Sequence, residues 1–378
     1  MAPHPAVAEI RRAVRELLIF LRQGSPGLQS AGRSRTGHPA SGISSARRSR
    51  TARLLVACSG GADSLALAAA TAFEAPRLGL AAGLVTVDHG LQEGSADHAA
   101  RVAAFGYELG LDPVETLTVD VGTAGGPEAA ARDARYAALS ATAGALDADV
   151  LLGHTLDDQA ETVLLGLGRG SGPRSIAGMR AVGPGPTGNA PGSEAAAAGT
   201  GLFLRPLLGV RRTTTLAACH ALGLEPWADP HNADPSFQRV RLRREVLPLL
   251  EDVLQGGVAE ALARTAGLVR DDLDALDQIA AMNTPFIAPE ADERGVHALE
   301  VAALLDQPRA IRTRVLRVWA IAVGASELTA THTAALDALV VDWHGQGALD
   351  LPGGVRVVRA SGKLDAIAPT PSARQGPP

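Results

Sequence analysis

The sequence feature that most constrains the fold is a diglycine turn between a buried strand and a helix. The apolar run 54–58 is typical of a strand buried on both faces, and the segment 65–73 is typical of a helix. Without a Cβ, the two glycines let backbone N–H groups turn inward, and the following helix adds the positive end of its dipole. We therefore predict an anion-binding loop made of Ser59, Gly60, Gly61, Ala62, Asp63 and Ser64.

An ordinary turn with a helix cap would have a similar composition, because Gly, Asp and Ser are common in turns. The position of the loop favours nucleotide binding. It follows the first strand of an alternating α/β pattern, and doubly wound sheets bind nucleotides at the carboxyl ends of their strands. The loop is neither a Walker A motif nor a Gly-x-Gly-x-x-Gly motif. Its Ser-Gly-Gly-x-Asp-Ser pattern resembles the loop of the ATP pyrophosphatases, which adenylate a carbonyl oxygen and release pyrophosphate.

Strand and helix signals alternate along most of the chain, with short connections between them. This order predicts an α/β fold, a doubly wound parallel sheet, with a second, smaller helical domain after it. The expected strands are 54–58, 82–88, 113–119 and 150–153, and the expected helices are 65–73, 95–109, 127–146, 157–167 and 210–222. The expected domains are a basic, partly disordered extension over 1–50, a nucleotide-binding domain over 51–237 with an exposed insertion at 183–201, a helical domain over 238–345, and a short hairpin and tail over 346–378.

Composition and charge narrow the function classes. The two cysteines, Cys58 and Cys219, form no C-x-x-C pair, which argues against a disulfide framework, a zinc site or an iron–sulfur cluster. No apolar run reaches the roughly 20 residues of a membrane span, so we expect a cytoplasmic protein without a membrane partner. The net charge is −5, yet residues 1–53 carry ten arginines and two glutamates, an excess that suits a phosphate backbone. The segment 6–21 could instead form one amphipathic helix.

A second polar cluster follows the strand expected at 150–153. His154, Asp157, Asp158 and Glu161 lie at the same expected edge of the sheet as the diglycine loop. Asp158 and Glu161 are three residues apart and share a helix face. Acids in a first helical turn also cap a helix and favour its dipole, so a structural role is the alternative. Three carboxylates and a histidine exceed what capping requires, and they could hold a divalent cation or an ammonium group.

The string Gly-His-Thr-Leu-Asp-Asp-Gln-Ala-Glu-Thr over 153–162, together with the diglycine loop, resembles the tRNA(Ile)-lysidine synthetase family of the PP-loop superfamily. The resemblance implies an adenine nucleotide alpha hydrolase-like fold and ATP and Mg²⁺ as cofactors. It also implies ligation of free L-lysine to C2 of the wobble cytidine of tRNA(Ile), through an adenylated cytidine, and a tRNA-binding role for 238–345. The expected catalytic residues are Asp63, Asp158, Glu161, His154 and Arg205; the expected metal ligands are Asp63 and Asp157; and Asp158 and Glu161 are expected to bind lysine.

Two further segments match motifs of this family. Asp88 and His89 end the strand expected at 82–88 and are expected to join the ATP site, although histidines at such positions are often structural. Glu128, Arg132, Arg135 and Tyr136 share one helix face, and Arg132 is an expected lysine ligand because arginine binds carboxylates at two points. An exposed, salt-bridged helix is the alternative.

A basic stretch near residue 240 is the expected tRNA contact. Phe237, Arg239, Arg241 and Arg243 could hold tRNA phosphates and stack on an unpaired base. The family usually has an asparagine after the first of these arginines, where this chain has Val240, so that single contact is not carried over. A plain amphipathic helix is compatible with the same residues.

Two other functions remain open at this stage. A tRNA thiolation enzyme would share the loop and the adenylation, but sulfur transfer usually needs paired cysteines. A non-catalytic nucleotide-binding module could be built on the same fold, although the intact carboxylates argue against it. The sequence leaves the existence of a homodimer open.

Overall fold

The computed structural model describes residues 2–23, 53–88, 90, 94–120, 127–170, 172–184, 201–227, 234–287, 297–326 and 328–367. His89 and most of the insertion expected at 183–201 lie outside these residues. The chain divides into two compact units. Unit 1 comprises Met1–Arg169, Gly178–Asn189 and Glu194–Ala266, and unit 2 comprises Gly170–Ala177, Ala190–Ser193 and Gly267–Pro378.

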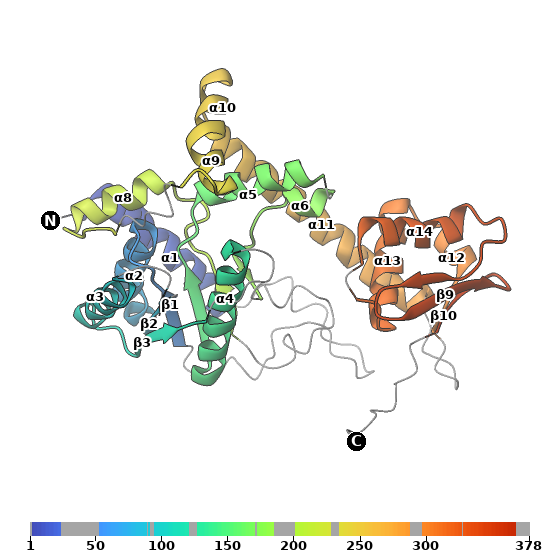
Figure 1. Ribbon diagram of the computed structural model, residues 1–378, viewed down its shortest axis with the longest axis horizontal. Coiled ribbons are helices and arrows are strands. Elements are labelled where there is room, and N and C mark those ends of the chain that lie inside the picture. The colour runs from blue at the N-terminus through green and yellow to red at the C-terminus, as the bar shows by residue number, and fades with distance from the viewer. Residues whose placement is uncertain are drawn as a thin grey trace. The chain divides into compact units, whose positions relative to one another are not determined.

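Unit 1 is built on a six-stranded sheet with the order β3-β2-β1-β4-β6-β5. The neighbouring strands β1, β2 and β3 are labelled in Figure 1. Every neighbouring pair is parallel except β5 and β6. The strands are β1 (Arg53–Ala57), β2 (Ala81–Asp88), β3 (Val114–Thr118), β4 (Ala148–Leu152), β5 (Val182–Gly183) and β6 (Phe203–Leu204). The helices are α1 (Pro5–Gln23), α2 (Ala62–Glu74), η3 (Pro76–Leu78), α3 (Ser95–Glu108), α4 (Pro127–Leu146), α5 (Leu156–Arg169), α8 (Arg212–Ala221), α9 (Gln238–Arg241), the π-helical turn η6 (Leu242–Val246) and α10 (Leu247–Val253).

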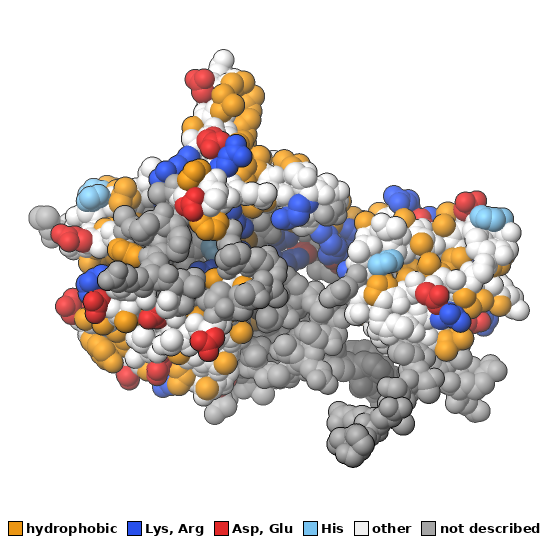
Figure 2. Space-filling model, viewed as in Figure 1, with side chains coloured by type: hydrophobic (Ala, Val, Ile, Leu, Met, Phe, Trp, Pro, Cys, Tyr) orange, Lys and Arg blue, Asp and Glu red, His pale blue; other side chains and the backbone are white. Residues whose placement is uncertain are grey.

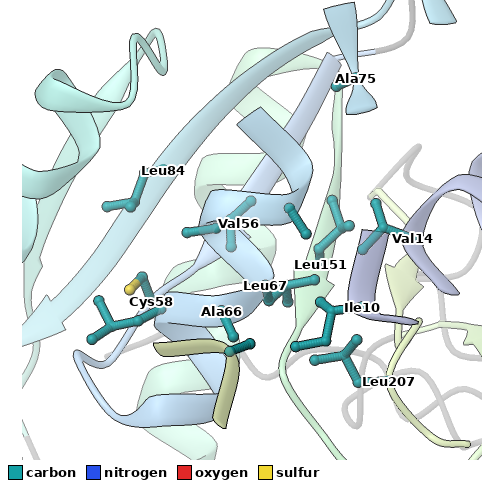
Figure 3. Close-up of a cluster of buried hydrophobic side chains, with 14 of the residues drawn as sticks. Ile10, Val14, Val56, Cys58, Ala66, Leu67, Ala75, Leu84, Leu151 and Leu207 are labelled. Atoms are coloured by element: carbon teal, nitrogen blue, oxygen red, sulfur yellow. The ribbon is translucent and has the colours of Figure 1, made fainter. Parts of the chain in front are cut away.

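Alternate residues of β1 supply two separate cores, as the period-two geometry of a strand requires. Leu54 and Val56 pack with residues of α1, α2 and α8 on one face of the sheet (Figure 3). Leu55 packs on the other face with Tyr136 and Leu139 of α4. Both faces of the sheet are therefore covered by helices, and each fully buried leucine contributes roughly 2 kcal/mol.

Helix α1 belongs to the first of these cores. Its residues Ile10, Val14 and Leu18 are almost completely buried, next to α2 and α8. Arg15 also forms an ion pair with the buried carboxylate of Glu74 on α2, with 2.7 Å between Nη2 and Oε1. For this part of the extension expected at 1–50, the alternative of an amphipathic helix is correct, and the helix is part of the folded core. Residues 24–52 lie outside the described residues.

The strand order has a switch point between β1 and β4. From β1 the chain proceeds outward to β2 and β3, and then returns to place β4 on the other side of β1. Ligands of open α/β sheets bind outside the carboxyl ends of the strands at such a point. The diglycine loop follows β1, and the acidic helix α5 follows β4, so both motifs flank the switch point.

Unit 2 contains a four-stranded antiparallel sheet of order β7-β10-β9-β8, packed against helices. Its core includes Trp319, Leu336 and Leu364. Arg312 and Asp337 form a buried ion pair in the same unit, with 2.6 Å between Nε and Oδ1. The elements are α6 (Pro173–Ile176), most of α11 (Val258–Ile287), β7 (His297–Glu300), α12 (Val301–Leu305), α13 (Arg309–Ala322), α14 (Ala330–Val341), β8 (Leu349–Leu351), β9 (Val355–Ala360) and β10 (Lys363–Ile367).

The doubly wound α/β class and the smaller second domain are confirmed, with one difference in detail. The sequence predicts a helical second domain closed by a hairpin; the hairpin β8–β9 forms, but β10 and β7 extend it into a sheet. The four-residue strand β7 is too short to leave an alternating pattern in the sequence. None of the helices in the described ranges has the length and apolar character needed to cross a bilayer.

Candidate active site

The diglycine loop is held in one conformation by its own side chains. Gly60 has a φ of 79°, which favours glycine, and a Cβ there would lie 2.4 Å from Cε1 of His98. The backbone N–H of Ser59 donates to Oγ of Ser64 (3.2 Å), and that hydroxyl donates to the carbonyl of Gly61 (2.9 Å). The loop is therefore preorganised at the N-terminus of α2, where an anion is favoured.

Two aromatic residues that the sequence interpretation missed support this loop from outside. Nε2 of His98 lies 2.8 Å from the carbonyl oxygen of Ser59. The rings of His98 and Trp227 have centroids 3.9 Å apart, and the backbone N–H of Trp227 donates to the carbonyl of Gly60 (2.9 Å). No local motif marks either residue, because both act through tertiary contacts.

The end of β4 comes very close to the first turn of α2. A Cβ at Gly153 would lie 3.1 Å from backbone atoms of Asp63 and Ser64. Glycine at this position therefore allows the diglycine loop and the acidic helix to meet at one edge of the sheet.

Asp158 caps the acidic helix α5. Its Oδ2 accepts hydrogen bonds from the backbone N–H (2.8 Å) and the hydroxyl (2.7 Å) of Thr155. Burial alone would raise the pKa of Asp158, but the charge of Arg212 and the Thr155 hydrogen bonds outweigh it, and the pKa is lowered. The capping alternative is thus correct for Oδ2 of Asp158, whereas Oδ1 of the same side chain forms an ion pair with Arg212.

Arg212 joins the two motifs, although it was not among the expected site residues. Its guanidinium lies 2.7 Å from Oδ1 of Asp158, 3.3 Å from Oδ2 of Asp63 and 3.5 Å from Oε1 of Glu161. Burial alone lowers the pKa of Arg212, but four neighbouring carboxylates outweigh it and raise that pKa above its ordinary value. The sequence did contain a local signal for Arg212. An arginine in the first turn of a helix is disfavoured by the helix dipole, so its presence there indicates a compensating interaction.

Asp63 and Asp157, the expected metal ligands, are both engaged by the start of α8. Asp63 accepts a hydrogen bond from the hydroxyl of Thr215, and burial raises its pKa despite that bond and the charge of Arg212. Asp157 accepts from the backbone N–H of Arg212 (2.8 Å) and lies 3.2 Å from Nη2 of Arg211. In the described part of the chain, no group of three or more His, Cys, Asp or Glu side chains could hold a metal ion. Mg²⁺ usually needs only one or two carboxylates when phosphates complete its shell, and Asp63 is the one of these two acids that lies in the diglycine loop.

Glu161 is fully buried among arginines. Arg243 holds it at two points, with 2.7 Å from Nε to Oε1 and 3.2 Å from Nη2 to Oε2, and Nη1 of Arg239 lies 3.9 Å from Oε2. Two of the arginines expected to contact tRNA therefore face the acidic helix. Arg241 is exposed and pairs with Glu245 at 2.9 Å, and Phe237 is only half exposed. Figure 2 shows basic and acidic side chains side by side over α9 and the base of α10.

A second arginine cluster surrounds the ring of Tyr136. The guanidinium carbons of Arg132 and Arg135 lie 5.4 and 5.5 Å from the ring centroid. Arg205 is buried, bonds to Tyr136 and donates to the carbonyl of Arg180 (3.1 Å), while its Nε has no partner. Burial lowers the pKa values of Arg135 and Arg205, and no carboxylate of the described residues is among the groups that oppose this shift.

His154 interacts electrostatically with both charged clusters. Burial lowers its pKa to about 3, with Asp158 opposing that shift and Arg205, Arg135 and Arg132 adding to it. The imidazole is therefore neutral, and its buried Nδ1 has no hydrogen-bond partner. Of the expected ATP-site residues after β2, Asp88 accepts from the backbone N–H of Gly90 (2.9 Å), and His89 lies outside the described residues.

Family models match both units. One described as the PP-loop domain matches residues 40–250, and one described as the TilS substrate binding domain matches residues 299–364. A tRNA(Ile)-lysidine synthase of Thermobifida fusca (strain YX) is 53% identical over 96% of this chain and 98% of that protein. One of Salinispora tropica is 52% identical over 97% of both chains, and one of Streptomyces coelicolor is 53% identical over 96% of this chain and 99% of that protein.

Among solved structures, a U34-tRNA thiolase from Methanococcus maripaludis is 17% identical, with a TM-score of 0.50, over 70% of this chain and 80% of that chain. This likeness shows the fold of the nucleotide-binding unit. The full-length relatives and the two family models show more: the chain belongs to the tRNA(Ile)-lysidine synthase family of PP-loop enzymes, nucleotide-binding ligases of tRNA modification.

Proposed function

We propose that this protein uses ATP to join free L-lysine to C2 of the wobble cytidine of tRNA(Ile). The observation that carries the proposal is that Arg212 joins Asp63 of the diglycine loop to the acid pair Asp158 and Glu161. The arginine cluster around Tyr136 is related to this acid pair through His154, which interacts with Asp158 and with the arginines. A triphosphate, an ammonium and a carboxylate are the groups that such subsites would bind.

The first step is adenylation of the base. The C2 carbonyl oxygen of cytidine attacks the α-phosphate of ATP, and the P–O bond to pyrophosphate breaks. The loop from Ser59 to Ser64 would receive the pyrophosphate, because its N–H groups and the dipole of α2 already favour an anion there. Mg²⁺, held by Asp63 and the phosphates, would neutralise charge that develops on the phosphate oxygens.

The second step is attack by lysine. An ε-amine attacks the activated C2, the C2–O bond to AMP breaks, and the proton on nitrogen must pass to a base. Asp158 and Glu161 would hold the amino groups and accept this proton, and Arg132 with Arg205 would hold the carboxylate. His154 is neutral, buried and interacts with groups of both subsites, so it is suited to positioning the amino acid rather than to adding charge.

Recognition of tRNA(Ile) would involve exposed groups near α9, with Arg241 contacting phosphate and Phe237 stacking on a splayed base. Because ATP and tRNA are the substrates, we expect the reaction in the cytoplasm.

The proposal is tested with purified protein by measuring pyrophosphate release. We expect pyrophosphate release over many turnovers to require ATP, tRNA(Ile) with a CAU anticodon and L-lysine together, because the adenylated cytidine is consumed only when lysine attacks it. We also expect lysidine in the tRNA digest. Ornithine in place of lysine is the matched control, since it is one methylene shorter. Release over many turnovers that is independent of lysine would contradict the proposal.

A further inference from the structure

The acid pair proposed to hold the amino groups of lysine is already neutralised by the protein itself. Nη2 of Arg212 lies 2.7 Å from Oδ1 of Asp158, and Nε of Arg243 lies 2.7 Å from Oε1 of Glu161. An ammonium ion approaching these oxygens would meet two guanidinium charges at the same place. Lysine can therefore bind the pair only if a guanidinium first moves away.

Of the two guanidinium groups, that of Arg212 is held less firmly by its carboxylate partners. Arg243 contacts Glu161 at two points, whereas Arg212 divides its contacts among three acids, two of them at 3.3 and 3.5 Å. One of those acids is Asp63, in the first turn of the helix that follows the diglycine loop. A triphosphate bound at that loop would place several negative charges beside Asp63, and guanidinium groups bind phosphate oxygens strongly and at two points.

We infer that Arg212 is a positioning residue that couples the binding of ATP to the binding of lysine. Without nucleotide, Arg212 neutralises Asp158 and Glu161 and keeps cations out. With nucleotide, Arg212 turns from Asp158 towards the phosphates, and the amino group of lysine takes its place on the carboxylates. The inference rests on the proposed function, because it assigns lysine and ATP to neighbouring subsites.

The exchange keeps the charge of the site balanced at each stage. Arg243 stays on Glu161, one cation, Arg212 or lysine, faces Asp158 before and after the exchange, and the triphosphate gains a cation when it binds. By linkage, the factor by which ATP tightens lysine binding equals the factor by which lysine tightens ATP binding. Couplings of this kind are typically about 5- to 150-fold, and we expect at least about tenfold here.

The test measures L-lysine binding by titration calorimetry on the full chain, with and without α,β-methylene-ATP, which cannot release pyrophosphate. We expect lysine to bind at least about tenfold more tightly with the analogue, and the analogue to bind more tightly with lysine by the same factor. Equal lysine affinity in both conditions overturns the inference. The wild-type comparison needs no substitution, so it stands even where a variant fails to fold.

Variants assign the coupling to a residue. Without nucleotide, Arg212→Gln is expected to bind lysine more tightly than the wild type does. The lysine affinity of this variant should be the same with and without nucleotide. Arg211→Gln is the matched control: it is the adjacent residue and contacts Asp157 and Glu260 instead, so it should keep the coupling. A coupling that persists in Arg212→Gln, or that is lost only in Arg211→Gln, overturns the assignment.

Failure of the inference can be told from failure of the proposed function. Uncoupled binding together with lysine-dependent pyrophosphate release would overturn the role of Arg212 alone. Absence of lysine-dependent release with ATP and tRNA(Ile) present would overturn both.

Discussion

Arg243 and Glu161, 82 residues apart in the chain, form a two-point ion pair at the centre of the site. Glu161 has no exposed surface, and Arg243 reaches it from the π-helical turn η6. π-Helical turns are rare overall, but those that occur are often found at functional sites, because the extra residue changes the direction in which neighbouring side chains point. The pair thus fixes a basic stretch of the sequence to the acidic helix of the nucleotide-binding unit.

Removing the charge of Glu161 should destabilise the protein and abolish activity. Glu161→Gln leaves the guanidinium groups of Arg243 and Arg212 without their buried partner, and breaking such a pair typically costs about 3 kcal/mol or more in the free energy of unfolding. Urea unfolding monitored by circular dichroism measures this. Glu245→Gln is the matched control, because Glu245 pairs with Arg241 on an exposed helix surface. Equal stability losses in the two variants would contradict the importance of the buried pair.

The neutral state of His154 should make stability fall as the pH falls. Because burial lowers the pKa of His154 to about 3, the unfolded chain, with an ordinary value near 6.5, binds a proton that the folded chain does not. Between pH 7 and pH 5 this should remove about 2 kcal/mol of stability, since each pH unit is worth about 1.4 kcal/mol below the unfolded pKa.

His154→Asn isolates this effect. Urea unfolding of both proteins at pH 7 and pH 5 should show the wild type losing about 2 kcal/mol more than the variant, because the other groups titrate alike in both. A parallel loss in the two proteins would mean that His154 is protonated in the folded state.

The sequence predicted what depends on local patterns and missed what depends on pairing across the sheet. The strand–turn–helix around Gly60 and the capping of α5 by Asp158 are local, so a short string of residues determines them. The role of Arg212 depends on β1 and β4 being neighbours, and the roles of Arg243 and His98 depend on tertiary contacts with α5 and with the diglycine loop. No segment of the chain encodes these contacts by itself. A row of arginines is equally consistent with phosphate binding and with buried ion pairs, and only the position of Glu161 distinguishes the two.

Helix α1 should contribute to the stability of the nucleotide-binding unit. Leu18 is almost fully buried between α2 and α8, so Leu18→Ala should lower the free energy of unfolding by about 3 kcal/mol through lost burial and a cavity. Phe20 lies two residues further along the same helix and is 46% exposed, so Phe20→Ala should change stability much less. If Leu18→Ala unfolded at the same urea concentration as the wild type, α1 would not be docked in solution.

The arginine cluster around Tyr136 should determine the affinity for lysine rather than for ATP. Arg132→Ala removes a guanidinium proposed to hold the lysine carboxylate, so the KM for lysine should rise at least about tenfold while the KM for ATP changes little. Pyrophosphate release at varied lysine and varied ATP measures both. Arg101, exposed on α3, provides the control Arg101→Ala, which should change neither constant. A rise confined to the KM for ATP would move the cluster to the nucleotide site.

Arg241 and Arg243 are two residues apart and should have different effects on tRNA binding. Arg241 is exposed and its ion pair with Glu245 lies at the surface, so a phosphate can displace that weak partner, whereas Arg243 is bound to buried Glu161. Arg241→Ala should therefore weaken tRNA(Ile) binding and reduce the slope of log affinity against log salt by about one, the value for one lost phosphate contact. Filter binding between low and moderate salt measures the slope. Arg243→Ala should leave that slope unchanged, and a larger change in its slope than in that of Arg241→Ala would show that Arg243 leaves Glu161 to contact the tRNA.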